Sequence, residues 1–474
     1  MRWLLITVMA ILMAGEYGKA GVIAGKAVIE GHAPGYEGTE LVFHTYADLI
    51  TYTEAEFFRA EVDSSGHFSA VTPEVSGPVY IFSNPGAWYL FMYVEPDREY
   101  SVVLPEYKSL TGREALNPYH QGIPVHLAVL NHGERELNSL IRNFDEYYDT
   151  LFGETFDRIS SGDRALLDSV SVGADRRFAG SGHAWFDDYR RYKMAMFRIM
   201  VRAETARSIS DKYFRNDMVL YRNMPYMELF NQIYNNYFLF FGRTSRGSSI
   251  FEDINRYASI SRLRNTLQSD NVLGDDRLLE LVMLKGLHGS FYGSDFSRSA
   301  LLRVTDSLAA TTVFKEHAEI ARNIREKTTR LMTGFSPPPL ELKNRNGEMT
   351  FLSDYEGEFV YLNFCTAVSY ACLSEYDLLQ RLDERYGSYF RIVTIFIGES
   401  FEDMDSFLQK NDYNWDFLFY GNQPSVLKDY DIRIFPTCYF IDRDGKLLMS
   451  PAPLPSENFE RYLVRTLRSE GIIK

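Results

Sequence analysis

The stretch "NFCTAVSYACLSEY", residues 363–376, decides how the last quarter of this chain is interpreted. It follows the apolar run "FVYLNF" and leads into a segment of helical periodicity, so it spans a turn from a strand into a helix. It contains Cys365 and Cys372, and the third cysteine of the chain, Cys438, lies in the same quarter. A cysteine at a helix N-terminus has a stabilised thiolate, because unpaired backbone N–H groups and the helix dipole favour the anion.

The residues around this stretch alternate between strand and helix patterns. "LELKNRNGEMTF" is typical of a hairpin with Asn346-Gly347 at its turn, and "FRIVTIFIG" and "WDFLFY" are typical of buried strands. A helix is expected from about Ser369 to Tyr386 and another near 401–410. A second hairpin, "PTCYFIDRDGKLL", and a last helix close the chain. This order predicts an α/β domain with a mixed sheet over 334–474.

The rest of the chain predicts two further regions, so the fold class is multidomain. Residues 21–107 contain short alternating segments separated by Gly, Pro, Asp and Ser, which predict an antiparallel β-sandwich. Residues 108–333 change to helical spacing, as in "ELNSLIRNFDEYYDTLF", and predict an all-α region. "SPPP", residues 336–339, marks the boundary before the α/β domain, because prolines cannot continue a helix.

Composition excludes some classes of partner and cofactor. The chain has 474 residues and a formal net charge of -14, which disfavours a general nucleic-acid or anionic-membrane binder. His120, His126 and His132 recur every six residues, which on a helix points them in different directions, so no metal site is predicted. No phosphate-binding glycine loop is present, and no cofactor is predicted.

The first 20 residues have the three-part pattern of an export signal. Arg2 precedes the apolar stretch from Trp3 to Ala14, and small residues follow at 18–20. That stretch is about 18 Å long as a helix, too short for a hydrocarbon core of roughly 30 Å, so no membrane span is expected. We expect an exported protein of the periplasm or cell envelope. No cysteine follows the apolar stretch to accept a lipid.

Residues from about Phe335 to the end resemble the thioredoxin-like fold, in particular the TlpA-type exported thiol-disulfide oxidoreductases. "LELKNRNGEMTFLSDYEGEFVYLNF" is similar to the opening of that family, and "IFPTCYFIDRDGKL" is similar to its later segment with a cis-proline. The order and spacing agree along about 140 residues. The β and helical regions resemble, more weakly, the N-terminal parts of TlpA-like proteins of the Bacteroidetes envelope.

The resemblance implies a degenerate redox motif. Aligned without gaps on the family pattern "NFWATWCPPCRAE", Cys365 takes the tryptophan position, Ser369 the nucleophilic cysteine and Cys372 the resolving cysteine. A serine cannot form a disulfide, and no histidine lies beyond His317 to activate it within this domain. Standard dithiol turnover, which needs both thiols, is therefore not expected.

Three roles stay open for the remaining cysteines. Cys365 can be a displaced partner of Cys372 if their Cα atoms lie within about 7 Å. Cys372 can form mixed disulfides alone, or it can be a small apolar core residue, as we expect for Cys438. The resemblance also places Tyr370 and Pro436 beside the site, Pro436 at the cis-proline that helps to align a substrate chain.

Two functions therefore compete. The first is impaired or residual thiol-disulfide chemistry by Cys372 on envelope proteins or peptides. The second is a noncatalytic module that binds an extended chain in the groove around Ser369, Tyr370 and Pro436. The sequence specifies neither the partner nor the oligomeric state.

Overall fold

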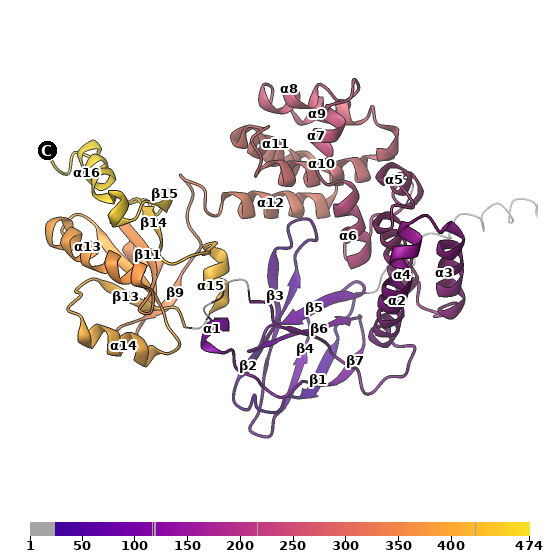
Figure 1. The fold of residues 1–474 in the computed structure, drawn as a ribbon, viewed down its shortest axis with the longest axis horizontal. Coiled ribbons are helices and arrows are strands. Elements are labelled where there is room, and N and C mark those ends of the chain that lie inside the picture. The colour runs from indigo at the N-terminus through magenta and orange to yellow at the C-terminus, as the bar shows by residue number, and fades with distance from the viewer. Residues whose placement is uncertain (1–23, 116, 118–119, 216, 422) are drawn as a thin grey trace, which may run out of the picture. The chain divides into compact units, whose positions relative to one another are not determined.

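The structure, a computed structural model, describes residues 24–474 apart from 116, 118, 119, 216 and 422 (Figure 1). The expected export signal, 1–20, lies outside the described residues. The described chain forms two compact units, and each is treated by itself. The first unit comprises the described residues up to Lys108, Ile123–Asn235 and Asp270–Val282, and the second comprises Ser109–Gly122, Asn236–Ser269 and Met283–Lys474.

The N-terminal strands form two sheets. One has five strands in the order β3-β2-β5-β6-β8, and the other has three in the order β4-β1-β7. The strands are β1 (Val28–His32), β2 (Glu40–Tyr46), β3 (Glu54–Glu61), β4 (His67–Val71), β5 (Val79–Ser83), β6 (Trp88–Val94), β7 (Glu99–Val103) and β8 (Ile123–His126).

Both sheets contribute to one buried cluster. Ile29 and Tyr100 of the smaller sheet and Phe43, Ile81 and Met92 of the larger one belong to it. Most strand pairs are antiparallel, but β1 pairs with β7 and β6 with β8 in parallel, so both sheets are mixed rather than purely antiparallel.

Strand β8 lies inside the range for which the sequence predicts helices, 108–333. It pairs with β6, where Trp88 faces Ile123 and Phe91 faces His126. The sequence did not reveal this strand because it is only four residues long, contains Pro124 and buries neither face. The helical part of the chain therefore begins after β8, apart from the short helix α1 (Gly112–Ala115).

The turn "DSSGHF", residues 63–68, links β3 to β4 and thereby connects the two sheets. Asp63 organises it by accepting hydrogen bonds from the Ser65 and His67 N–H groups at 2.8 and 3.0 Å. Gly66 has a φ of 80°, which residues with a side chain rarely adopt.

The central region is helical, as its periodicity predicts. Helix α2 buries one stripe that includes Leu137, Ile141 and Phe144. Asn236 has a φ of 54° and separates α6 from α7, so the helical pattern is interrupted there. The helices are α2 (Leu137–Ser160), α3 (Arg164–Arg177), α4 (Ala184–Met200), α5 (Ala206–Tyr213), α6 (Met224–Ile233), α7 (Tyr237–Gly242), α8 (Ile250–Asn255), α9 (Ile260–Leu267), η1 (Asn271–Leu273), α10 (Asp276–Ser290), α11 (Arg298–Thr311) and α12 (Lys315–Thr329). Over the described part of the chain, no helix combines the length and apolar character that a membrane crossing requires.

The C-terminal domain is a seven-stranded sheet in the order β10-β9-β13-β12-β11-β14-β15. Strands β11, β12 and β13 are mutually parallel, and the others are antiparallel to their neighbours. The elements are β9 (Glu341–Asn344), β10 (Met349–Phe351), η2 (Leu352–Tyr355), β11 (Val360–Thr366), α13 (Tyr370–Tyr386), β12 (Arg391–Ile397), α14 (Phe401–Lys410), β13 (Asp416–Phe419), α15 (Pro424–Asp429), β14 (Thr437–Ile441), β15 (Leu447–Ala452), η3 (Pro455–Glu457) and α16 (Phe459–Ser469).

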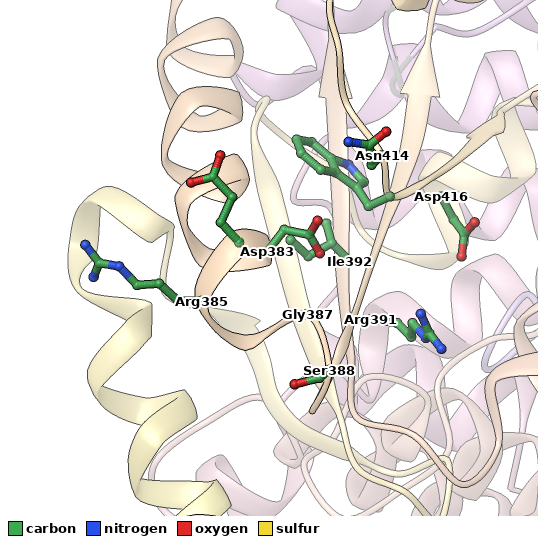
Figure 2. Close-up of a pocket in the computed structure, with 10 residues that line it drawn as sticks. Asp383, Arg385, Gly387, Ser388, Arg391, Ile392, Asn414 and Asp416 are labelled. Carbon is green, nitrogen blue, oxygen red and sulfur yellow. The ribbon is translucent and has the colours of Figure 1, made fainter.

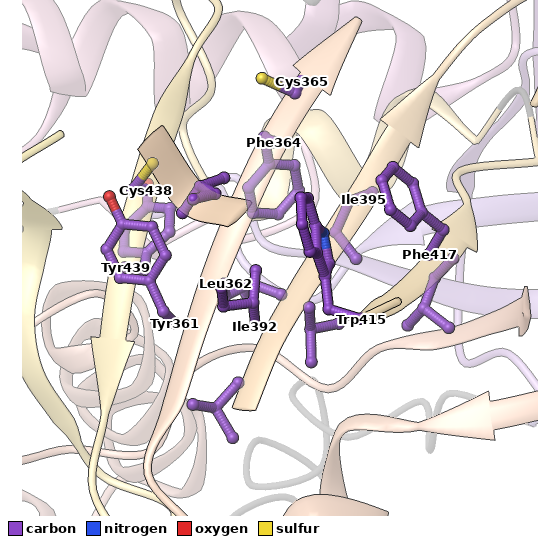
Figure 3. Close-up of a cluster of buried hydrophobic side chains, with 14 of the residues drawn as sticks. Tyr361, Leu362, Phe364, Cys365, Ile392, Ile395, Trp415, Phe417, Cys438 and Tyr439 are labelled. Carbon is purple, nitrogen blue, oxygen red and sulfur yellow. The ribbon is translucent and has the colours of Figure 1, made fainter. Parts of the chain in front are cut away.

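Helices cover both faces of this sheet (Figure 1). On one face Tyr376 of α13 packs against Phe407 of α14, and α13 contacts α16 through the hydrogen bond from Tyr386 to Glu460. On the other face Tyr430, at the end of α15, packs on Phe364. Strand β11 is buried along its whole length, which explains its continuous apolar run (Figure 3). Because β11 is buried at the centre of the sheet, it holds the residues that follow it in a defined position.

Candidate active site

Cys372 lies in the first turn of α13, next to the carboxyl end of β11. Ser369 occupies the N-cap position of this helix, and no acidic residue stands in the first turn. The side chain of Cys372 is fully buried. It therefore has the position at a helix N-terminus that favours a thiolate, but no direct exposure to solvent.

Three donors surround the Cys372 sulfur. The Thr366 N–H donates to it at 3.3 Å, and the Cys365 thiol and the Ser369 hydroxyl are close enough to lower its pKa as donors. Ser369 makes no side-chain hydrogen bond to the helix backbone, so its hydroxyl serves the sulfur instead of the usual cap. These bonds, that of Cys365 first, lower the pKa of Cys372, whereas burial and the charge of Glu375 oppose them.

Cys365 is the second thiol of the site. Strand alternation places Tyr361, Asn363 and Cys365 on the face of β11 that α13 covers. Cys365 is fully buried, and burial together with the neighbouring Cys372 raises its pKa well above the ordinary value. Cys365 therefore stays protonated and donates to the sulfur of Cys372.

Cys438 lies deeper on the same face, on β14 (Figure 3). Its thiol donates to Asn363 Oδ1 at 3.4 Å, and burial raises its pKa to about 12. Glu375, also buried, accepts a hydrogen bond from the Ser456 N–H at 3.0 Å. The buried position of Cys438 is the one that the sequence predicts.

The loop before β14 runs beside the thiols. Thr437 pairs with Phe364, so Pro436 lies one step further along the ladder, next to Cys365. The Phe435–Pro436 peptide bond is cis. Around this point the surface is apolar and solvent-exposed, with exposed fractions that reach 85% at Tyr370. The exposed apolar side chains are Val368, Tyr370, Leu373 and Ile434.

The structure thus brings together Cys365, Ser369 and Cys372, while Tyr370 points into solvent. Sequence reasoning missed the roles of Thr366 and Tyr376. Tyr376 follows Cys372 by one helical turn, and the buried thiols contribute to the rise of its pKa, which burial dominates. The i, i+4 spacing between Cys372 and Tyr376 could have indicated the role of Tyr376. Nothing in the sequence indicates that the backbone N–H of Thr366 is a donor.

Two other features were considered as sites. Among the described residues no group of three or more His, Cys, Asp or Glu side chains is arranged to hold a metal ion. A polar pocket of about 370 Å3 lies where α13 ends and β12 and β13 begin, with Asp383, Arg391 and Asp416 in its wall (Figure 2). It lies at the opposite edge of the sheet from the thiols and takes no part in their site.

Comparison with known proteins defines the class of this domain. Residues 334–449 match the AhpC/TSA family. The C-terminal part of the chain is therefore a thioredoxin-like domain related to thiol-disulfide oxidoreductases. The match covers most of this domain and leaves outside it the N-terminal strands and helices as well as residues 450–474.

Particular relatives each match about a quarter of the chain. The chain is similar to the thioredoxin-like protein YneN of Bacillus subtilis, 24% identical over 121 residues, which are 25% of this chain and 71% of that protein. It is also similar to the thiol-disulfide oxidoreductase ResA of the same organism, 28% identical over 116 residues, which are 24% of this chain and 64% of that protein.

Solved structures that match include the thioredoxin domain of a thiol-disulfide oxidoreductase from Bacteroides vulgatus, at 20% identity and a TM-score of 0.26, covering 28% of this chain and 96% of that one. Another is a thiol:disulfide interchange protein from a Bacteroides species, at 21% identity and a TM-score of 0.27, covering 29% and 90%.

Proposed function

We propose that the C-terminal domain is a TlpA-type thiol-disulfide module with a degenerate Ser-x-x-Cys motif, in which Cys372 and Cys365 form a displaced redox pair. The observation that carries this proposal is the set of donors on the Cys372 sulfur: the Cys365 thiol, the Thr366 N–H and the Ser369 hydroxyl. Two hydrogen-bonded thiols, one with a lowered pKa, have the chemistry that disulfide exchange requires.

The reaction runs in two steps. The Cys372 thiolate attacks one sulfur of a substrate disulfide, that S–S bond breaks, and the leaving thiolate takes a proton from solvent. Cys365 then loses its proton and attacks the Cys372 sulfur, which forms the Cys365–Cys372 disulfide and releases the second substrate thiolate. The substrate gains the two electrons that the pair loses.

Burial explains why this activity is impaired. Both thiols are fully buried, and Ser369 occupies the position where the family nucleophile meets its substrate. Exchange therefore requires the loop at 367–369 to move aside, which lowers the fraction of molecules that can react. The N-terminal export pattern supports a place in the periplasm or cell envelope, with envelope proteins or peptides as substrates.

The test compares reduction of a model peptide disulfide by the wild-type protein and by Cys372→Ala, Cys365→Ala and Ser369→Cys. We expect slow wild-type turnover that Cys372→Ala abolishes and a faster Ser369→Cys enzyme. Cys365→Ala should stop after one mixed disulfide, which mass spectrometry detects. Activity restricted to Ser369→Cys would refute the displaced pair.

A second candidate function is favoured by the apolar surface beside Pro436. Val368, Tyr370 and Ile434 are each more than 70% exposed, although apolar side chains gain free energy from burial. These residues suit a noncatalytic module that binds an extended chain. In that case a protein lacking both Cys365 and Cys372 should keep its affinity for partner peptides, and Tyr370→Ser should lose it.

A further inference from the structure

A second cavity lies in the C-terminal domain, with a volume of about 530 Å3. Three apolar side chains form much of its wall, and they come from separate elements. They are Met349 of β10, Phe401 at the start of α14 and Phe419 at the end of β13. The rings of Phe401 and Phe419 meet edge to face at 5.9 Å between centroids. This volume and this wall are typical of a site for a small molecule.

The cavity lies at the edge of the sheet where the parallel strands end. Phe419 is the last residue of β13, and Phe401 follows shortly after the last residue of β12, Ile397. In open α/β sheets, ligands bind outside the carboxyl ends of the strands. The Cys365–Cys372 pair lies at the same edge but two strands away, about 10 Å by the spacing of strands, and does not line the cavity.

Polar groups on the wall define the charge of the occupant. Among the described residues that line the cavity, Lys343 is the only charged one, and Gln423 adds a side-chain amide. Lys343 lies between the apolar residues in the sheet, because it pairs with Met349 on one side and with Phe419 on the other. It is exposed, and within the described part of the chain no salt bridge involves it. Its ammonium is therefore available to an anion.

We infer that this cavity binds a small amphipathic carboxylate. The apolar body of the ligand packs against Met349, Phe401 and Phe419, and its carboxylate pairs with Lys343. An amine of the same shape meets a like charge, and a neutral chain gains only the apolar contacts. The inference does not rest on the proposed thiol chemistry, because no cysteine lines the cavity.

The test measures binding to the full-length protein by isothermal titration calorimetry. The probes are decanoate, decanol and decylamine, all below the concentrations at which they aggregate. We expect decanoate to bind at least about five times more tightly than decylamine. Lys343→Gln should weaken decanoate about fivefold, the size of one exposed ion pair, and should leave decanol unchanged.

Matched variants distinguish binding in the cavity from a general effect of the protein's charge on ligand affinity. Lys410→Gln removes another exposed lysine, at the end of α14, and should leave all three affinities unchanged. Met349→Glu places a carboxylate on the wall and should weaken decanoate more than decanol. Cys372→Ser should change none of them, so failure here is distinct from failure of the proposed function.

Four results would each overturn the inference. Three of them are equal binding of decanoate and decylamine, equal effects of Lys343→Gln and Lys410→Gln, and the absence of saturable decanoate binding. Decanol binding as tight as decanoate would also overturn it, because the occupant would then be a neutral apolar chain or an apolar side chain of a polypeptide.

Discussion

Replacing Ser369 by alanine tests whether its hydroxyl holds the Cys372 thiolate. Ser369 is one of three donors to that sulfur, and its hydroxyl makes no competing bond to the helix. A hydrogen bond to a charged group contributes about 1.5 kcal/mol at the low end of its range, and a pKa unit corresponds to about 1.4 kcal/mol. Because Thr366 and Cys365 remain, we expect Ser369→Ala to raise the pKa of Cys372 only in part, by the contribution of one hydrogen bond.

The effect on reactivity is smaller than the change in ionisation. One pKa unit lowers the thiolate fraction about tenfold below the pKa, but a more basic thiolate is about threefold more nucleophilic at a Brønsted slope of roughly 0.4–0.5. The alkylation rate of Cys372 near neutral pH should therefore fall about threefold. The measurement is the pH–rate profile with iodoacetamide, followed at Cys372 by peptide mass spectrometry.

The midpoint of the pH–rate profile decides the outcome. The opening of the loop that exposes Cys372 multiplies the alkylation rate by the same factor at every pH, so it does not move the midpoint. Ser369→Thr keeps a hydroxyl and should keep the midpoint. Ser374→Ala removes an exposed hydroxyl of the same helix that bonds only to the backbone at Ala371, and it should also keep the midpoint. An unchanged midpoint in Ser369→Ala would show that the hydroxyl does not act on the sulfur.

Three further predictions concern other parts of the chain. Because burial raises the pKa of Cys438 to about 12, alkylation of the native protein near pH 8 should label Cys372 and spare Cys438, whereas denatured protein should be labelled at both. Gly347 has a φ of 81° with open space around it, so Gly347→Ala should cost about 1 kcal/mol in urea unfolding, and Gly77→Ala, without positive φ, should cost less. The hydrogen bonds of the turn lower the pKa of Asp63 to about 2, below its ordinary value. The stability that this carboxylate contributes is therefore present above about pH 4 and is lost as the pH falls toward 2. Asp63→Asn should reduce the pH dependence of the free energy of unfolding between about pH 4 and pH 2.

Local patterns in the C-terminal domain were enough to predict its strands and its longer helices, but not the short helix α15. The helix expected near 401–410 is Phe401–Lys410, and the turn at Asn346-Gly347 joins β9 to β10. The continuous apolar run of β11 follows from burial on both faces. Such signals are local, because each depends on the periodicity or the turn residues of a single segment.

The features that the sequence did not reveal depend on contacts between distant segments. Strand β8 exists because it pairs with β6, and a four-residue segment with exposed residues carries no period of its own. The approach of Cys365 to Cys372 depends on the path of the loop between them, which six intervening residues do not fix. Thr366 acts through its backbone N–H, and every residue except proline has that group.

In the proposed Ser-x-x-Cys motif, the serine at position 369 stands in place of a nucleophilic cysteine but keeps a hydrogen-bond donor. A cysteine there can attack a disulfide, whereas a serine at the N-cap can only hydrogen bond, and in this chain it bonds to the sulfur one turn further into the helix. The groups that stabilise an anion therefore converge on Cys372. The thiol that stands ready to resolve a mixed disulfide is then Cys365, which replaces the family tryptophan. In the proposed pair, Cys372 takes the attacking role and Cys365 the resolving role. Both sulfurs are buried, so substrates reach the attacking sulfur only when the loop opens.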